Sequence, residues 1–315
     1  MIAVFLGAGF SRCCGVPLTG DLFREHPEVD AITRKKLVAE VTTRWDEWHS
    51  LTGGSAEEYL SYLQAEADFS LQRATWYIAL AIALRVGKLE FVGMNIKITR
   101  HNLDRTTAST IHETFWDVVC GVDPEPSVVT TNYDILSERG LRHEPRPRAN
   151  RPGFNYGNGP EYLRGGGYPS YAHIQRITIS GKSRLSKLHG SISWSQNNGE
   201  IWKYHDCRPA IRGNPLIIAP VREKKVPTIM QSIWDQAEHD LKKAATWIIV
   251  GYSLPIYDYA VRDLLKKSSS ASPNIHLLDP SDGIADTYHD LLPNCKITKH
   301  KGLPEGIESL RMALQ

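Results

Sequence analysis

The stretch Ile2-Ala-Val-Phe-Leu-Gly-Ala-Gly-Phe-Ser-Arg12 decides the fold of this 315-residue chain. Five consecutive apolar residues are followed at once by a Gly-x-Gly turn. An apolar run without polar alternation predicts a strand covered on both faces, as in a parallel sheet between layers of helices. A glycine turn between such a strand and a helix lets backbone N–H groups approach a phosphate, helped by the helix dipole. The alternative is a tight turn that binds nothing.

Similar apolar runs recur along the chain and predict further strands. They cover residues 127–131, 216–219, 247–250 and 275–278, with weaker candidates at 184–189 and 296–298. Each of the first four is followed by a residue typical of turns. These runs predict an α/β fold with a Rossmann-like, mostly parallel sheet and helices on both faces.

Helical signals lie between the strands. Ser55 and Glu58 form a predicted capping box, and apolar residues at helical spacing continue from there to residue 119. Residues 30–120 are therefore predicted to be a helical insertion, and 229–241 a crossover helix. Residues 144–169 are rich in Gly and Pro and predict a long loop. We predict one domain over residues 1–315.

The composition excludes several classes of protein. Lys and Arg number 37 against 35 Asp and Glu, so the net charge of +2 shows no strong signal for nucleic-acid binding. The five cysteines form no Cys-x-x-Cys pair, which argues against a zinc ribbon, and no metal ligand is assigned. No apolar stretch is long enough for a membrane helix, and the first residues do not resemble a signal peptide. The expected location is the cytoplasm.

Polar residues that could carry chemistry follow five of the predicted strands. In open α/β sheets, ligands bind outside the carboxyl ends of the strands, so these residues are expected to share one edge. Each has a plain alternative as a turn or core residue. The candidates are Gly7, Ala8, Gly9, Phe10 and Ser11 after the run 2–6, Thr131, Asn132 and Asp134 at the end of 127–131, His189 at the end of 184–189, Gly251, Ser253 and Asp258 after 247–250, and Asp279 after 275–278.

In this order the motifs resemble those of the sirtuin (Sir2) superfamily, particularly its prokaryotic branch associated with antiviral defence. Gly7 to Ser11 is similar to the family's glycine-rich NAD motif, and Asn132-Tyr-Asp134 to its Asn-x-Asp segment. His189-Gly190 is similar to the catalytic His-Gly. Gly251-Tyr-Ser253 with Asp258 resembles the later phosphate and ribose loop of the defence-associated branch.

The resemblance implies cleavage of the nicotinamide–ribose bond of NAD+, with NAD+ as substrate. Asn132, Asp134 and His189 would be catalytic. The residues that would bind NAD+ are those of the glycine turn, Thr131, Gly251, Ser253, Asp258 and Asp279. Protein-deacylating sirtuins carry a four-cysteine zinc module after the His-Gly, whereas only Cys207 and Cys295 follow His189. No zinc is therefore expected, and NAD+ hydrolysis is favoured over deacylation.

The resemblance also implies how such an enzyme is regulated. An NAD+ hydrolase in antiphage defence must be inactive until triggered, which predicts a homo-oligomer, a separately encoded activator or sensor subunit, or both. An ATPase or translocase and an Argonaute-type protein are the expected kinds of partner. The alternatives are an NAD+-dependent protein deacylase or ADP-ribosyltransferase, and a non-catalytic sensor of ADP-ribose or a similar nucleotide.

Overall fold

A computed structural model describes most of the chain. The described residues are 1–23, 32–66, 70–86, 88–92, 95–99, 108–141, 154–156, 161–164, 174–176, 182–204, 207–222 and 224–315. The predicted loop over 144–169 lies largely outside them, and its described parts include two short strands, β5 (Phe154–Asn155) and β6 (Glu161–Arg164).

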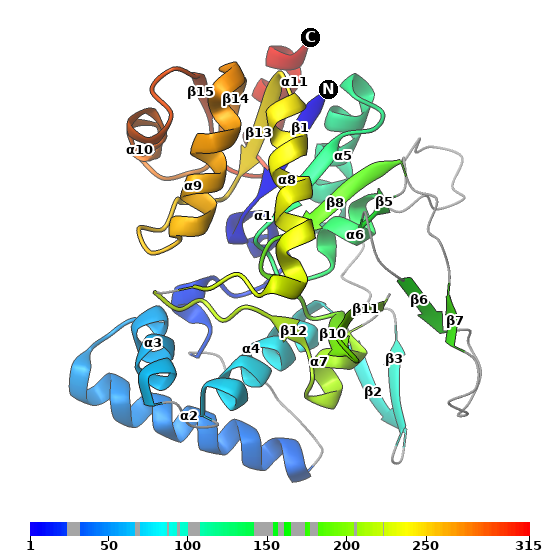
Figure 1. Ribbon diagram of the computed structural model, residues 1–315, viewed down its shortest axis with the longest axis vertical. Helices are drawn as coiled ribbons and strands as arrows, with labels where there is room; N and C mark the ends of the chain where they lie inside the picture. Colours follow the sequence, from blue (N-terminus) through cyan, green and yellow to red (C-terminus); the bar gives the residue numbers. More distant parts are fainter. Residues whose placement is uncertain are drawn as a thin grey trace.

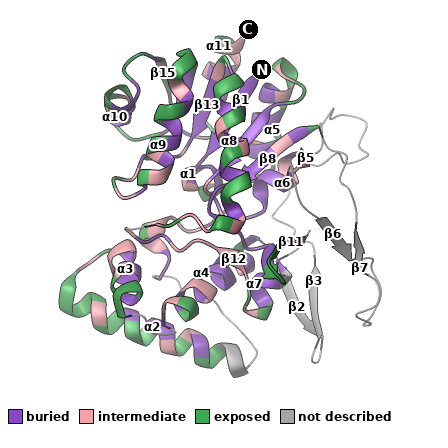
Figure 2. Ribbon diagram, viewed as in Figure 1, coloured by how far each residue is buried: buried purple, intermediate pink, exposed green. Residues whose placement is uncertain are grey.

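A seven-stranded sheet forms the centre of the molecule, and all its strand pairs are parallel. Every residue of its central strands β1 and β4 is buried, as expected for strands covered on both faces. Figure 2 shows the buried strands β1 and β13 at the centre of the sheet. In spatial order the strands are β15 (Lys296–His300), β14 (Asn274–Leu278), β13 (Thr246–Val250), β1 (Ile2–Leu6), β4 (Ser127–Thr130), β8 (Ser183–Lys187) and β5.

Helices cover both faces of this sheet (Figure 1). On one face α8 (Gln231–Lys243) packs beside α9 (Tyr259–Ser268), and on the other α5 (Ala108–Val122) packs against α6 (Leu136–Leu141) and α11 (Ile307–Leu314). The predicted Rossmann-like α/β fold is confirmed. The other short helical elements are α1 (Ala8–Arg12), α10 (Ile284–Leu291) and the 3-10 turns Thr228–Met230 and Ser269–Ala271, together with the 3-10 turn Thr19–Asp21, which contacts α3 (Ala56–Glu66).

The winding of the sheet reverses beside β1. The chain passes from β1 to β4 and β8 on one side, then returns through α8 to β13 on the other side of β1. The carboxyl ends of β1 and β13 therefore form the switch point at which ligands bind in sheets of this kind.

A second group of elements lies beyond the carboxyl ends of the central strands (Figure 1). Helix α3 begins with the predicted capping box, since the Ser55 backbone N–H donates to Glu58 Oε2 at 2.8 Å and the Glu58 N–H to Ser55 Oγ at 3.3 Å. The elements of this group are α2 (Ile32–Thr52), α3 (Ala56–Glu66), α4 (Ser70–Val86), α7 (Arg208–Arg212), β2 (Lys88–Val92), β3 (Asn95–Thr99), β6, β7 (Ile174–Arg176), β9 (Gly190–Ser191), β10 (Trp194–Asn197), β11 (Glu200–Tyr204) and β12 (Leu216–Ile217).

Two expectations from the sequence need correction. The apolar run 216–219 does not join the parallel sheet, because only β12 forms there and it pairs antiparallel with β9. Pro215 and Pro220 flank this run and supply no N–H groups for a longer ladder. The hairpin of β2 and β3 interrupts the stretch expected to be helical. Among the described residues, no helix is long and apolar enough to cross a membrane.

Candidate functional site at the carboxyl edge of the sheet

Two glycine turns interlock at the switch point. Gly9 N–H donates to the Gly251 carbonyl at 2.9 Å, and Gly7 N–H donates to the Val250 carbonyl at 2.9 Å. A Cβ on Gly9 would lie 2.7 Å from Gly251 Cα, and one on Gly7 would lie 2.5 Å from the Gly251 carbonyl oxygen. The glycines are therefore required first for the close approach of the turns after β1 and β13.

Because of this packing, fewer backbone N–H groups of the glycine turn are available to a phosphate than the sequence suggests. The N–H groups of Gly7 and Gly9 are used between the two turns, and Phe10 N–H donates to the Gly7 carbonyl at 3.0 Å. Three of the amides expected to cradle a pyrophosphate thus donate within the protein. Phe10 is fully buried and stacks on His112 at a centroid distance of 4.0 Å, so its side chain belongs to the core.

The replacement Gly251→Ala tests this packing, with Gly283→Ala as the matched control. Both glycines have positive φ, +59° and +75°, and alanine costs about 1–2 kcal/mol in that conformation. Only Gly251 is confined, because its Cβ would lie 2.4 Å from Gly9 Cα, whereas a Cβ at Gly283 meets nothing within 4 Å. We expect Gly251→Ala to lose about 1–3 kcal/mol more free energy of unfolding in urea titrations. Equal losses would contradict the close approach.

Ser11, Asn132 and Asp134 form a buried hydrogen-bonded cluster. Ser11 Oγ donates to Asp134 Oδ2 at 2.7 Å, and Asn132 Nδ2 donates to the Gly7 carbonyl at 2.8 Å and to Ser11 Oγ at 3.1 Å. Asp134 Oδ1 accepts the Leu136 N–H at 2.8 Å. Both Asp134 oxygens are therefore engaged. Among the described residues, no group donates a hydrogen bond to Asn132 Oδ1, so this oxygen is available to a ligand.

His189 lies at the end of β8 and faces a carboxylate that the sequence analysis assigned to a different role. Its Nε2 lies 3.5 Å from Asp258 Oδ1. Both atoms are buried, and within the described part of the chain neither has a partner at ordinary hydrogen-bond geometry. The ring also bonds to the backbone of Thr131, and this bond must use Nδ1 because Nε2 has none. His189 Nε2 therefore lies beside a carboxylate, at a distance longer than that of an ordinary hydrogen bond.

The surroundings set the protonation of this pair. Burial and the charge of Lys224 lower the pKa of His189, so the imidazole is neutral at neutral pH. Burial alone would raise the pKa of Asp258, but His189, Lys224 and Tyr252 outweigh it and hold that pKa well below its usual range. A neutral base next to a fixed negative charge can accept a proton and then be stabilised as a cation.

Three residues near this pair were missed by the sequence analysis. Lys224 Nζ lies 3.2 Å from Asp258 Oδ2, and the Tyr252 hydroxyl donates to the same oxygen at 2.9 Å. Glu57 of α3 interacts electrostatically with Lys224 and Asp258, and burial raises the pKa of its carboxyl. Tyr252 stands inside the quoted Gly251-Tyr-Ser253 motif, whereas Lys224 and Glu57 come from separate segments that meet this pair only in the folded chain.

The other predicted residues lie at the same edge, and of these Thr131 contacts the His189 ring through its backbone. The Thr131 N–H donates to the Leu6 carbonyl at 3.1 Å, which ties the ends of β4 and β1 together. Asp279 is buried, and its Oδ1 accepts the Ser281 N–H at 2.9 Å in a local turn. Ser253 is exposed.

The fold and these residues define a Rossmann-like α/β protein whose polar side chains gather where parallel sheets bind ligands. Within that class, the chain has a sirtuin-like fold. It matches the solved structure of a Sir2 homologue in complex with NAD at a TM-score of 0.50, with 14% sequence identity, over 100% of this chain and 90% of that one. A Sir2 homologue mutant in complex with 2′-O-acetyl ADP-ribose gives a TM-score of 0.48 and 14% identity, over 99% and 90%. No protein-family model and no curated protein matches this sequence.

Proposed function

We propose that this protein binds NAD+ and hydrolyses its nicotinamide–ribose bond to give nicotinamide and ADP-ribose. The observation that carries the proposal is the buried pair His189 Nε2 and Asp258 Oδ1, 3.5 Å apart and without hydrogen bonds. Buried polar atoms without partners are rare in proteins and demand an explanation. A ribose hydroxyl or a water held beside His189 would give Nε2 the donor that it lacks.

The proposed roles of the surrounding residues follow from the hydrogen-bonding atoms that each has available for a ligand. The nicotinamide of NAD+ is already cationic, so it leaves without a general acid, and the protein must position the ribose and deliver water. Asn132 Oδ1 would accept from the ribose or the water. Neutral His189 would take the proton, and Asp258 would stabilise the resulting imidazolium. Asp134 Oδ2 already accepts the Ser11 hydroxyl. The carboxylate would therefore bind the carboxamide of nicotinamide only by accepting an additional hydrogen bond.

The cysteines favour water over an acyl-lysine as the acceptor. Cys207 precedes α7 and Cys295 precedes β15, and both are buried. They are the only cysteines after His189, so a four-cysteine module cannot form in that part of the chain. A deacylase with the sirtuin zinc module therefore does not fit these residues.

The test is to incubate purified protein with NAD+ and to quantify nicotinamide, ADP-ribose and remaining NAD+. A hydrolase releases nicotinamide and ADP-ribose in equal amounts without any peptide. Parallel reactions with acetylated peptide show whether nicotinamide release depends on an acyl-lysine. Release only with that peptide, together with 2′-O-acetyl ADP-ribose, would establish the deacylase instead. Binding of NAD+ measured by a rise in Tm, with no cleavage under any condition, would establish a sensor.

We also propose that this activity depletes NAD+ in antiphage defence under the control of self-assembly or a separately encoded subunit. Unregulated hydrolysis would exhaust the NAD+ of its own host, so the active state must be conditional. Light scattering combined with the activity assay tests this directly. A monomer with full activity and no added partner would contradict it.

A further inference from the structure

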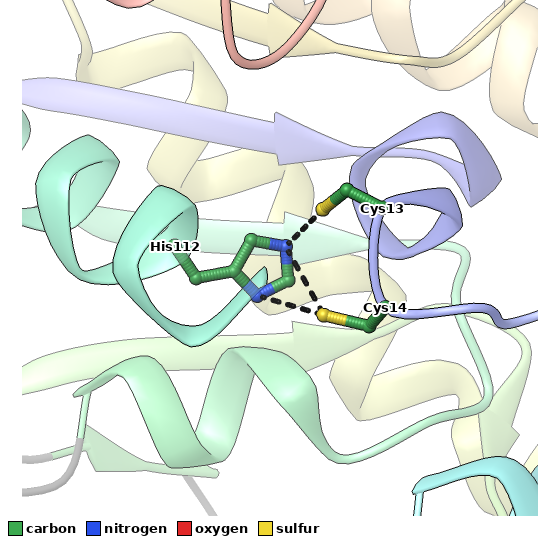
Figure 3. A group of neighbouring side chains, drawn as sticks. All are labelled: Cys13, Cys14 and His112. Carbon is green, nitrogen blue, oxygen red and sulfur yellow. Dashed lines mark hydrogen bonds between the residues drawn. The ribbon is translucent and has the colours of Figure 1, made fainter. Parts of the chain in front are cut away.

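A second cluster of reactive side chains lies between α1 and α5, behind the glycine turn. Figure 3 shows Cys13 and Cys14 with both sulfur atoms directed at the imidazole of His112. Cys13 Sγ lies 3.3 Å from His112 Nε2, and Cys14 Sγ lies 3.8 Å from Nδ1 and 4.0 Å from Nε2. One donor atom from each residue fits within 4.8 Å of the others. The proposed function makes no use of these three residues.

The separations match those between the ligands of a tetrahedral metal ion. Zinc binds thiolate at about 2.3 Å and imidazole at about 2.0–2.1 Å, which sets sulfur and nitrogen about 3.6 Å apart. The distance of 3.8 Å from Cys14 Sγ to His112 Nδ1 lies close to that value, and Cys13 Sγ lies 3.3 Å from Nε2 of the same ring. Donor atoms of the three residues lie within 4.8 Å of one another, and a rotation of the Cys13 side chain toward Nδ1 would place its sulfur beside the same ion.

The surroundings of the imidazole resemble the support that a metal ligand requires. His112 Nε2 lies 2.8 Å from the Phe10 carbonyl, and the ring stacks on Phe10 with an angle of 5° between the planes. An Nε2–H donated to the Phe10 carbonyl fixes the ring and leaves Nδ1 as the ligand atom. In metal sites the ring nitrogen that does not bind the ion usually donates its N–H in this way. Cys14 and His112 are buried, whereas Cys13 is partly exposed and provides the side from which an ion can enter.

We propose that Cys13, Cys14 and His112 bind a thiophilic divalent cation, with zinc as the probe. Two thiolates and a neutral imidazole balance the charge of Zn²⁺, and mixed sulfur and nitrogen donors in tetrahedral geometry favour zinc over harder cations. The described residues supply three ligands here, so water takes the fourth position. The ion links α1, directly after the glycine turn, to α5, about 100 residues later in the chain. It therefore stabilises the turn at the ligand-binding edge.

The experiment uses the full chain without a histidine tag, purified under a phosphine reductant. After exposure to Zn²⁺ and removal of loosely bound metal, we expect about one zinc per chain by elemental analysis. Titration with Co²⁺ should give thiolate-to-cobalt charge-transfer absorption, and chelation should lower the Tm. Cys13→Ser and Cys14→Ser should each abolish the stable zinc and the absorption.

Cys295→Ser is the matched control, because Cys295 is another buried free thiol but lies far along the chain, directly before β15. It should retain the zinc and the cobalt absorption. Cys13 is partly exposed, so Cys13→Ser keeps the test decisive if Cys14→Ser does not fold. A wild-type protein with no bound zinc and no charge-transfer band overturns the proposal. Zinc retained equally by both serine variants overturns it too.

Discussion

Replacing His189 with alanine is expected to lower the rate of NAD+ cleavage by about 10²- to 10⁴-fold, the usual contribution of a general base. The imidazole is buried, and its Nε2 is the unpartnered atom that faces Asp258. Alanine removes this base and leaves Asn132 in place, so substrate affinity should change much less than turnover. Nicotinamide release at saturating NAD+ and the rise in Tm on NAD+ binding measure the two quantities separately.

His289→Ala is the control for this replacement. His289 is an exposed histidine of α10, at the opposite end of the sheet order from β8. Its loss should leave both the rate and the NAD+-induced rise in Tm at wild-type values. Wild-type turnover in His189→Ala would remove His189 from the mechanism, whereas loss of the Tm rise would show that the residue acts in binding.

The pH dependence separates catalysis by His189 from a structural role. A base must be unprotonated to act, so kcat/KM should fall as the pH drops through the pKa of His189 in the free enzyme. Because that pKa is lowered by burial, the acid limb should lie below the ordinary histidine value of 6.5. Asp258 raises the pKa of His189, so Asp258→Asn should move the limb to still lower pH. An unmoved limb would assign the titration to another group.

The sequence predicted the edge of the sheet where the candidate residues gather. Apolar runs and turn residues are local signals, and they placed all five motifs after β1, β4, β8, β13 and β14. The parallel arrangement of these strands then brings the motifs to one edge. Residues inside a motif, such as Asn132 and Asp134, are positioned by the strand that they follow.

The pairing of side chains across that edge could not be predicted. Asp258 was expected to contact phosphate or ribose, but the structure sets it against His189, although β4 and β1 separate β8 from β13. Lys224 and Glu57 reach the same carboxylate from segments without any catalytic pattern. Such contacts depend on how loops cross the sheet, and that information lies in tertiary packing. Cys13 and Cys14 have no Cys-x-x-Cys spacing, and their link to His112 also arises only from packing.

Lys187→Met should have the largest effect on stability, because it leaves a carboxylate buried without its cation. Lys187 is fully buried, and its Nζ lies 3.0 Å from Glu138 Oε1 and donates to the Asp134 carbonyl. Among the described residues Glu138 Oε2 has no partner, and Oε1 also accepts the Tyr156 hydroxyl at 2.8 Å, so Lys187 is the cation that compensates this buried charge. Removing one member of a buried ion pair costs about 3–5 kcal/mol. We expect that loss in the free energy of unfolding from urea titrations.

The matched control is Lys182→Met, which removes an exposed lysine 2.7 Å from exposed Glu125. Surface ion pairs contribute about 0–1 kcal/mol, so this variant should unfold at nearly the wild-type urea concentration. Equal losses in the two methionine variants would show that burial of Lys187 carries no special cost.

The double variant Lys187→Met with Glu138→Leu shows which contact matters. Replacing a whole buried pair by apolar side chains is often neutral, so most of the lost stability should return. If it does, the cost of Lys187→Met is the unpaired Glu138 carboxylate. If the two losses add instead, the lysine acts chiefly through the Asp134 carbonyl. It would then hold the segment that carries Asn132 and Asp134, and the single variant should lose NAD+ cleavage even where it remains folded.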